Sequence, residues 1–153
     1  MKRKIKIIVA IFLCFYLLFA YGCKLETKQY TIKQLTNQLQ SVELAQYSEY
    51  YYKEIGACAY HKVYVLSEEE IEYILPLLIG DYTFVPEPSF YNEYDYCIKF
   101  VYKSYDVCFF VNSIEDPSIN FTNSYSNVEN RTKAIEYCIE KYNNAKRGDV
   151  SNE

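Results

Sequence analysis

Residues 94–111 read YDYCIKFVYKSYDVCFFV, and this stretch determines the class of fold that the chain can adopt. Apolar and polar side chains alternate along both of its halves. Because successive side chains of a strand point to opposite faces of a sheet, the alternation predicts two strands, over 94–102 and 105–111, each with one apolar face. The chain should therefore contain an antiparallel hairpin that is buried on one side.

The register of this hairpin depends on its turn. If residues 103–104 form a two-residue turn, Tyr102 faces Tyr105 and Phe100 faces Val107, so both apolar sets lie on the same side of the sheet. A shift of one residue would place the two sets on opposite sides, and the parity of the pairing is therefore determined.

Two cysteines lie on the hairpin. With residues 103–104 in the turn, Cys97 faces Phe110 and Cys108 faces Lys99. The two thiols are then diagonal neighbours about 7–8 Å apart, beyond comfortable disulfide reach. A turn centred one residue earlier would place Cys97 directly opposite Cys108, so a bridge between them stays open but is not preferred.

The clearest helix start is Ser67, which has Glu70 three residues later. The Ser67 hydroxyl can accept a hydrogen bond from the Glu70 backbone while the Glu70 carboxylate reaches back, and acids suit the positive end of the helix dipole. Pro76 should bend or restart this helix, and Gly80 is well placed to end it.

Weaker patterns predict the remaining elements. The expected order is a helix over 32–40 opened by a Thr31–Gln34 capping box, strands over 42–51 and 57–66, the helix after Ser67, the hairpin, an edge strand near 118–122 and a last helix over 128–142 capped by Asn127. This order predicts an α+β fold in which an antiparallel sheet of about five strands has helices packed on one face.

The first 22 residues differ in character from the rest. Residues 1–6 carry four basic side chains and no acid, and an apolar run of 15 residues follows from Ile7 to Tyr21. A helix needs about 20 apolar residues to span a bilayer, whereas the core of an export signal needs about 7–15 after a basic start. The leader therefore predicts export of everything that follows it.

The run ends in FAYGC, residues 19–23, which resembles the lipobox of bacterial lipoprotein signal peptides. The resemblance covers residues 1–23 alone, and Ala20 stands where leucine is usual. It implies transfer of diacylglycerol to Cys23, cleavage after Gly22 and acylation of the new N-terminus, so that lipid would hold the chain on the outer side of the cell membrane. The alternative is an uncleaved signal anchor.

The expected organisation is a signal peptide over 1–22, a lipidated N-terminus and tether over 23–30, a single α+β domain over 31–143 and a flexible tail over 144–153. The first 22 residues hold four of the 16 basic residues and none of the 20 acids, which leaves 12 basic against 20 acidic residues and a formal charge of −8. This balance argues against nucleic acid as a partner, because nucleic-acid binders present concentrated positive charge.

Residues with catalytic potential are few. His61, the single histidine, follows Cys58 by three residues, but strand residues three apart point to opposite faces, so the pair cannot converge. Capping explains the acidic run at 68–70, and the chain has no nucleophile elbow, phosphate-binding glycine loop or metalloprotease helix. We expect no catalytic residue, no metal site and no cofactor.

Four cysteines follow Cys23, namely Cys58, Cys97, Cys108 and Cys138. An even number can form bridges in an exported domain or stay buried as thiols.

Tyrosine is abundant, with 19 residues. Two dense aromatic stretches form a candidate binding surface that comprises Tyr47, Tyr50, Tyr51, Tyr52, Phe90 and Tyr91. Tyrosine supplies contact area with a polar end at low entropic cost, although biased composition and core packing explain the same residues more simply.

These features favour a non-enzymatic protein-binding or inhibitory module, held at the envelope by lipid, whose partner is another envelope or extracellular protein. One alternative is an accessory subunit or hydrolase that acts on cell-wall polymer through carboxylates such as Asp95, Asp106 or Glu115. Such an enzyme needs two carboxyl groups in one cleft, about 5–9 Å apart. The other alternative is a structural envelope lipoprotein with no ligand of its own.

Overall fold

The computed structural model describes residues 26–47, 60–84, 95–117, 124 and 126–150. Its elements, in chain order, are β1 (Glu26–Tyr30), α2 (Ile32–Thr36), β2 (Leu39–Tyr47), β3 (Tyr60–Val65), α4 (Glu68–Leu78), β4 (Gly80–Phe84), β5 (Tyr96–Tyr102), β6 (Asp106–Phe109), β7 (Ile114–Glu115) and α5 (Val128–Val150). The fold is α+β, as the sequence predicts.

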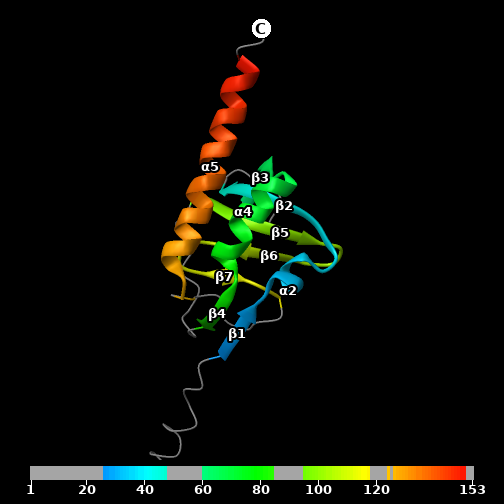
Figure 1. Ribbon diagram of the computed structural model, residues 1–153, viewed down its shortest axis with the longest axis vertical. Coiled ribbons are helices and arrows are strands. Elements are labelled where there is room, and N and C mark those ends of the chain that lie inside the picture. The colour runs from blue at the N-terminus through cyan, green and yellow to red at the C-terminus, as the bar shows by residue number, and fades with distance from the viewer. Residues whose placement is uncertain (1–25, 48–59, 85–94, 118–123, 125, 151–153) are drawn as a thin grey trace, which may run out of the picture.

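Five strands form an antiparallel sheet in the order β3-β2-β5-β6-β7, while β1 and β4 pair in a second, two-stranded sheet. Figure 1 shows α4 and α5 together in front of the five-stranded sheet. The core between them contains Ile74 and Leu78 of α4, Ala134 of α5, and Ile98 and Phe100 of β5. The predicted sheet of five strands with helices on one face is confirmed.

The hairpin of β5 and β6 has the predicted register. Phe100 pairs with Val107, and the Tyr102 backbone N–H donates to the Tyr105 carbonyl oxygen at 3.0 Å. The apolar sets of both strands therefore face the helices together, because the pairing keeps the parity that burial requires.

Cys108 consequently lies opposite Lys99 and not opposite Cys97. No bridge joins Cys97 to Cys108. Both cysteines are buried in a small cluster with Ala45 and Phe110, on the face of the sheet that points away from the helices.

Local capping determines where α4 begins. Ser67 Oγ accepts from the Glu70 backbone N–H at 3.3 Å, and Glu70 Oε2 accepts from the Ser67 backbone N–H at 2.8 Å, as predicted. The buried Glu70 also accepts from the Tyr64 hydroxyl at 3.0 Å. Pro76 does not restart the helix, which runs unbroken to Leu78, and Gly80 follows it with a φ of +140°.

The tether predicted over 23–30 is wrong from residue 26 onward, because residues 26–30 form β1. Each residue of β1 pairs with β4, from Glu26 opposite Phe84 to Tyr30 opposite Gly80. Among the side chains described in β1, only Tyr30 is buried. The segment therefore shows no apolar alternation, and its strand conformation comes from pairing with β4.

The first helix is shorter than predicted. Its capping box is present, but α2 ends at Thr36 and β2 begins at Leu39, inside the helix expected over 32–40. Gln38 takes a φ of +59°, a left-handed conformation that stops the helix. Leu39 then pairs with Tyr102 of β5, so strand pairing overrides the local helical pattern. β2 ends at Tyr47 and β3 begins at Tyr60, and these two residues are also the limits of the described ranges 26–47 and 60–84.

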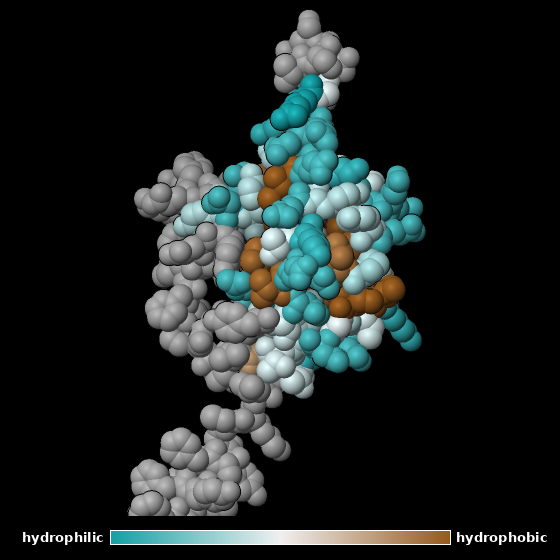
Figure 2. All heavy atoms as spheres, turned by 60° about the vertical axis from the view of Figure 1, so that its left-hand side comes forward, coloured by the Kyte–Doolittle hydropathy of each residue, from teal (hydrophilic) through white to brown (hydrophobic). Residues whose placement is uncertain are grey.

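The flexible tail predicted over 144–153 is wrong through residue 150, because α5 continues to Val150. Residues 143–148 are exposed, and this part of α5 projects past the sheet in Figure 1 and is hydrophilic in Figure 2. The first half of α5, which packs against the sheet, nucleates the helix, and each further residue then adds one backbone hydrogen bond.

Asn127, the predicted cap of α5, has a φ of +54° instead of the extended conformation of an ordinary cap. The edge strand predicted near 118–122 lies outside the described residues.

Arg131 of α5 is completely buried. Its Nη1 donates to the Ser113 carbonyl oxygen at 3.1 Å, and its Nη2 donates to the Ser124 carbonyl oxygen. Its guanidinium also lies 5.5 Å from the centre of the Tyr82 ring. Arg131 thereby joins α5 to β4 and to the chain on both sides of β7.

Candidate functional site

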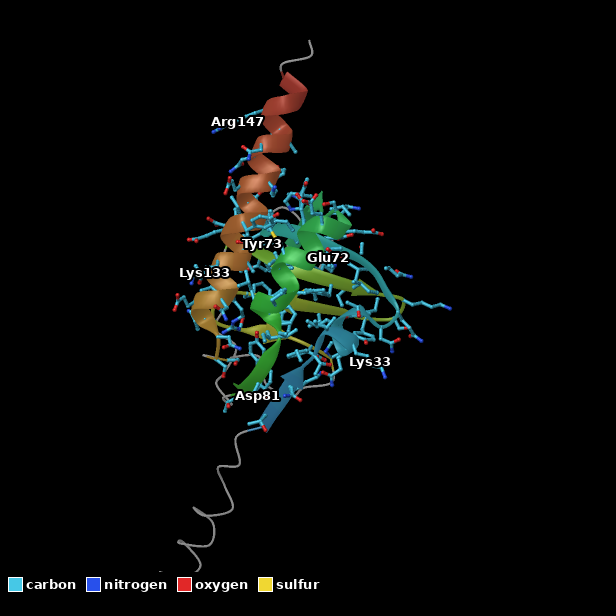
Figure 3. All side chains as sticks on the ribbon, in the orientation of Figure 1. Lys33, Glu72, Tyr73, Asp81, Lys133 and Arg147 are labelled. Carbon is cyan, nitrogen blue, oxygen red and sulfur yellow. The ribbon has the colours of Figure 1, made fainter. Side chains whose placement is uncertain are left out.

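A groove of about 500 Å³ opens at the end of the sheet where α2 lies beside the β5–β6 turn. In Figure 3, Lys33 marks α2 at this end of the molecule. The described residues that line the groove are Lys28, Tyr30, Gln34, Leu35, Asn37, Gln38, Tyr102, Tyr105, Val107, Asp116 and Pro117. The volume is within the range of about 300–1,000 Å³ that is typical of small-molecule sites.

One side of the groove holds a buried carboxylate. The Asp116 side chain is 4% exposed, forms an ion pair with Lys28, and accepts a hydrogen bond from the Tyr30 hydroxyl at 2.7 Å. β1 brings Lys28 and Tyr30 to the same face because they are two residues apart. Asp116 follows β7 directly, at the far edge of the five-stranded sheet.

Tyr30 is a hydrogen-bond donor at all physiological pH values. Burial, followed by the hydrogen bond to Asp116 and the charge of that carboxylate, raises the pKa of Tyr30 far above its usual value. Asp116 therefore keeps two donors, a phenol and an ammonium group, around its oxygen atoms.

An aromatic pair forms another wall. The rings of Tyr102 and Tyr105 stack with centroids 4.7 Å apart and planes 20° apart. Tyr102 is buried, donates its hydroxyl to the Leu35 carbonyl oxygen at 2.7 Å, and has a raised pKa because of burial. Tyr105 is 48% exposed, so part of its ring area is available to a ligand.

Three carboxamides stand at the rim. Gln34 is engaged in the capping box of Thr31, which fixes its side chain to the first turn of α2. Asn37 and Gln38 follow α2, and both side chains are exposed. A carboxamide offers a hydrogen-bond donor and an acceptor without charge.

The lining of the groove offers groups that can bind a ligand through shape, an aromatic ring and hydrogen bonds. Among the described residues that line it, Asp116 is the single acid, and histidine and cysteine are absent. General acid–base work on a glycosidic bond needs two carboxyl groups, and Asp116 is already engaged by Lys28 and Tyr30.

The carboxylates considered for wall-polymer chemistry lie elsewhere. Asp95, Asp106 and Glu115 do not line the groove. Asp106 forms an ion pair with Lys99 at 2.7 Å, and Asp95 is exposed. Burial raises the pKa of Glu115, which faces Cys108 on the sheet face away from the helices.

Most of the predicted aromatic surface lies outside the described residues, namely Tyr50, Tyr51, Tyr52, Phe90 and Tyr91, and so does Cys23. Tyr47 is described and is 40% exposed, with its ring edge-on to Tyr60 at 5.6 Å. It ends β2, whereas the groove lies beside the start of β2, eight residues or about 26 Å away. The groove is therefore separate from the aromatic surface that the sequence suggests.

His61 of β3 lies opposite Gln46 of β2, and Cys58 lies outside the described residues. Among the residues that the structure describes, no three histidine, cysteine, aspartate or glutamate side chains gather in a way that could hold a metal ion. No described helix is long and apolar enough to cross a membrane.

Sequence reasoning missed the groove residues. Lys28 and Tyr30 fall in a polar segment, and Asp116 precedes Pro117 in what looks like an ordinary turn. A signal that could have located them is absent from the local pattern, because the groove forms only when β1 and the end of β7 meet. Comparison with known proteins finds no family model, no curated protein and no solved structure that matches the chain.

Proposed function

We propose that this chain is a non-enzymatic binding module of the bacterial envelope, held by lipid on Cys23 at the outer side of the membrane. The observation that supports binding over catalysis is that Asp116 is already engaged in an ion pair and a hydrogen bond. It is the one described acid in the groove, and both Lys28 and Tyr30 engage it. The remaining lining offers shape, an aromatic ring and carboxamides, which are recognition groups.

The position of β1 supports a close association with the membrane. Glu26, the first residue of β1, is three residues after Cys23, and three residues span at most about 11 Å. Lys28 of the groove is five residues after Cys23, or at most about 18 Å. A lipid on Cys23 would therefore hold the groove near the bilayer, with the C-terminal turns of α5 at the opposite pole of the molecule (Figure 1).

Metabolic labelling with a palmitate analogue tests the anchor. Wild type and Cys14→Ser should incorporate the label and stay in the membrane fraction, whereas Cys23→Ser should incorporate none. Cys14 is the matched control because it lies within the same leader and has bulky residues before it. Equal labelling of Cys23→Ser and wild type would refute the anchor.

A photo-crosslinking amino acid tests the binding role in living cells, whatever the chemistry of the ligand. Placed at Tyr105 it should give a discrete adduct that disappears when the groove is blocked by Asn37→Trp. Placed at Tyr73 of α4, which is 56% exposed and also half of a stacked tyrosine pair, it should give none. Figure 3 shows Tyr73 on α4, away from α2, and Tyr73 is not among the residues that line the groove. The same weak background from both positions would refute a binding role for the groove.

A second candidate function is capture of another envelope or extracellular protein through the tyrosine surface. The exposure of Tyr47 at the other end of β2 favours it. In that case Tyr47→Ser should reduce crosslinking to a protein partner, whereas Tyr73→Ser should leave it unchanged. Equal crosslinking in both variants would remove Tyr47 from the proposed surface.

A further inference from the structure

We infer that the groove binds a short, uncharged oligosaccharide through the ring of Tyr105 and the carboxamides of Asn37 and Gln38. The inference rests on the proposed binding function and names the class of ligand. Four properties of the groove support it: its open aromatic ring, its uncharged rim, its compensated charges and the backbone of Gln38.

The ring of Tyr105 suits the face of a sugar. Tyr102 stacks on Tyr105 and holds its orientation, while the exposure of Tyr105 leaves ring area toward the groove. The face of an aromatic ring carries negative potential, so it attracts the weakly positive C–H groups of a pyranose. Leu35 and Val107 add apolar lining beside it.

The rim suits hydroxyl groups. Each sugar hydroxyl both donates and accepts a hydrogen bond, and the exposed carboxamides of Asn37 and Gln38 do the same in one plane. Two such groups beside an aromatic ring can bind hydroxyls on the edge of a pyranose while its face rests on Tyr105.

The charges of the groove argue against a charged ligand. Lys28 and Asp116 form an ion pair, and Tyr30 donates to the same carboxylate, so the two described charges in the lining compensate each other. An anionic or cationic ligand would lose hydration without gaining an opposite charge. A neutral ligand loses less.

The backbone of Gln38, which ends α2, also positions its side chain. It has a φ of +59°, a conformation that glycine adopts freely and glutamine rarely does. Residues with sparsely populated backbone conformations cluster at ligand sites, where the conformation directs a side chain toward the ligand. At Gln38 the left-handed turn that ends α2 places the side chain in the lining of the groove, where it can contact a ligand.

Isothermal titration calorimetry of the full-length protein tests this inference. The protein is extracted from membranes in a detergent without a sugar headgroup, since a maltoside would compete. The probes are maltotriose, cellotriose and N,N′,N″-triacetylchitotriose, all of which are uncharged. We expect at least one to bind with a Kd below about 1 mM. Tyr105→Ala should weaken that binding about five- to tenfold, as loss of an aromatic contact predicts.

Two variants separate recognition from folding. Tyr73→Ala removes the exposed half of a second stacked tyrosine pair and should leave the Kd within about twofold. Gln38→Gly should weaken binding while its melting temperature stays at or above that of wild type, a combination that a purely structural role of Gln38 would not give.

Two further probes distinguish a membrane glycolipid from a wall polymer as the source of the sugar. A diglucosyl diacylglycerol in detergent is compared with the same free disaccharide, and tighter binding of the lipid form would indicate a membrane glycolipid instead of a wall polymer. Failure of all neutral sugars to bind, or tighter binding of a charged sugar, would overturn the inference. If the Tyr105 crosslink persisted in that case, the binding function would stand with another ligand; if it were also absent, both proposals would fail.

Discussion

Replacement of Tyr30 by phenylalanine tests the physical description of the groove. Tyr30 is buried, and its hydroxyl donates to Asp116 Oδ2 at 2.7 Å. A hydrogen bond to a charged group contributes about 1.5–3 kcal/mol, so Tyr30→Phe should lower the free energy of unfolding by about 2 kcal/mol near pH 7. The ring itself is retained, together with its edge-on contacts to Tyr82 and Phe109.

The effect should depend on pH in a defined direction. The pKa of Tyr30 is raised in the folded protein, first by burial and then by Asp116, whereas in the unfolded chain it is about 10. Above pH 10 the unfolded state releases a proton that the folded state retains. The free energy of unfolding of the wild type therefore falls by about 1.4 kcal/mol per pH unit from this group, and the contribution is complete below pH 10.

Tyr30→Phe cannot show this loss, so the two stability curves should converge. A difference of about 2 kcal/mol at neutral pH divided by about 1.4 kcal/mol per unit places the crossing near pH 11.5. The assay is urea unfolding followed by circular dichroism at several pH values between about 7 and 11.5. The other buried tyrosines contribute equally to both proteins and cancel.

Tyr73→Phe is the control, because Tyr73 is 56% exposed and should leave the curve parallel to that of the wild type. A Tyr30→Phe curve that also stayed parallel above pH 10 would refute the reasoning, since it would mean that Tyr30 ionises as readily in the folded protein as in the unfolded chain.

Three further predictions concern other parts of the fold. Gln38→Gly should raise the free energy of unfolding by about 1 kcal/mol in calorimetry, because glycine relieves the left-handed strain at φ +59°, while Gln38→Ala should give no such gain. Arg131→Met should lower it by about 3 kcal/mol in urea unfolding, since the buried carbonyl groups of Ser113 and Ser124 lose their donors; a change under about 1 kcal/mol would contradict this role. Burial and then the charge of Glu70 raise the pKa of the Cys138 thiol to about 12, so peptide mass spectrometry should find it unmodified by thiol reagents at neutral pH until the protein unfolds.

Sequence alone determined the elements whose signals are local. The alternation on both sides of residues 103–104 required the parity seen in β5 and β6, because a slip would expose one apolar set. Ser67 and Glu70 determined the start of α4, since both capping hydrogen bonds are made within four residues of chain. The periodic apolar positions of α5 likewise predicted its docked half.

Only the tertiary structure decided β1, the end of α2 and the groove. The segment that contains Lys28 and Tyr30 is a strand because β4 offers backbone partners, and nothing in its own side-chain pattern requires one. α2 ends at Thr36, because the chain from Leu39 onward pairs with β5, beginning opposite Tyr102. The environment of Asp116 depends on residues 86 and 88 positions earlier in the chain. Local periodicity reports which face of an element is buried, but it carries no information about which distant segments meet at the ends of a sheet, and the candidate site of this protein lies at such an end.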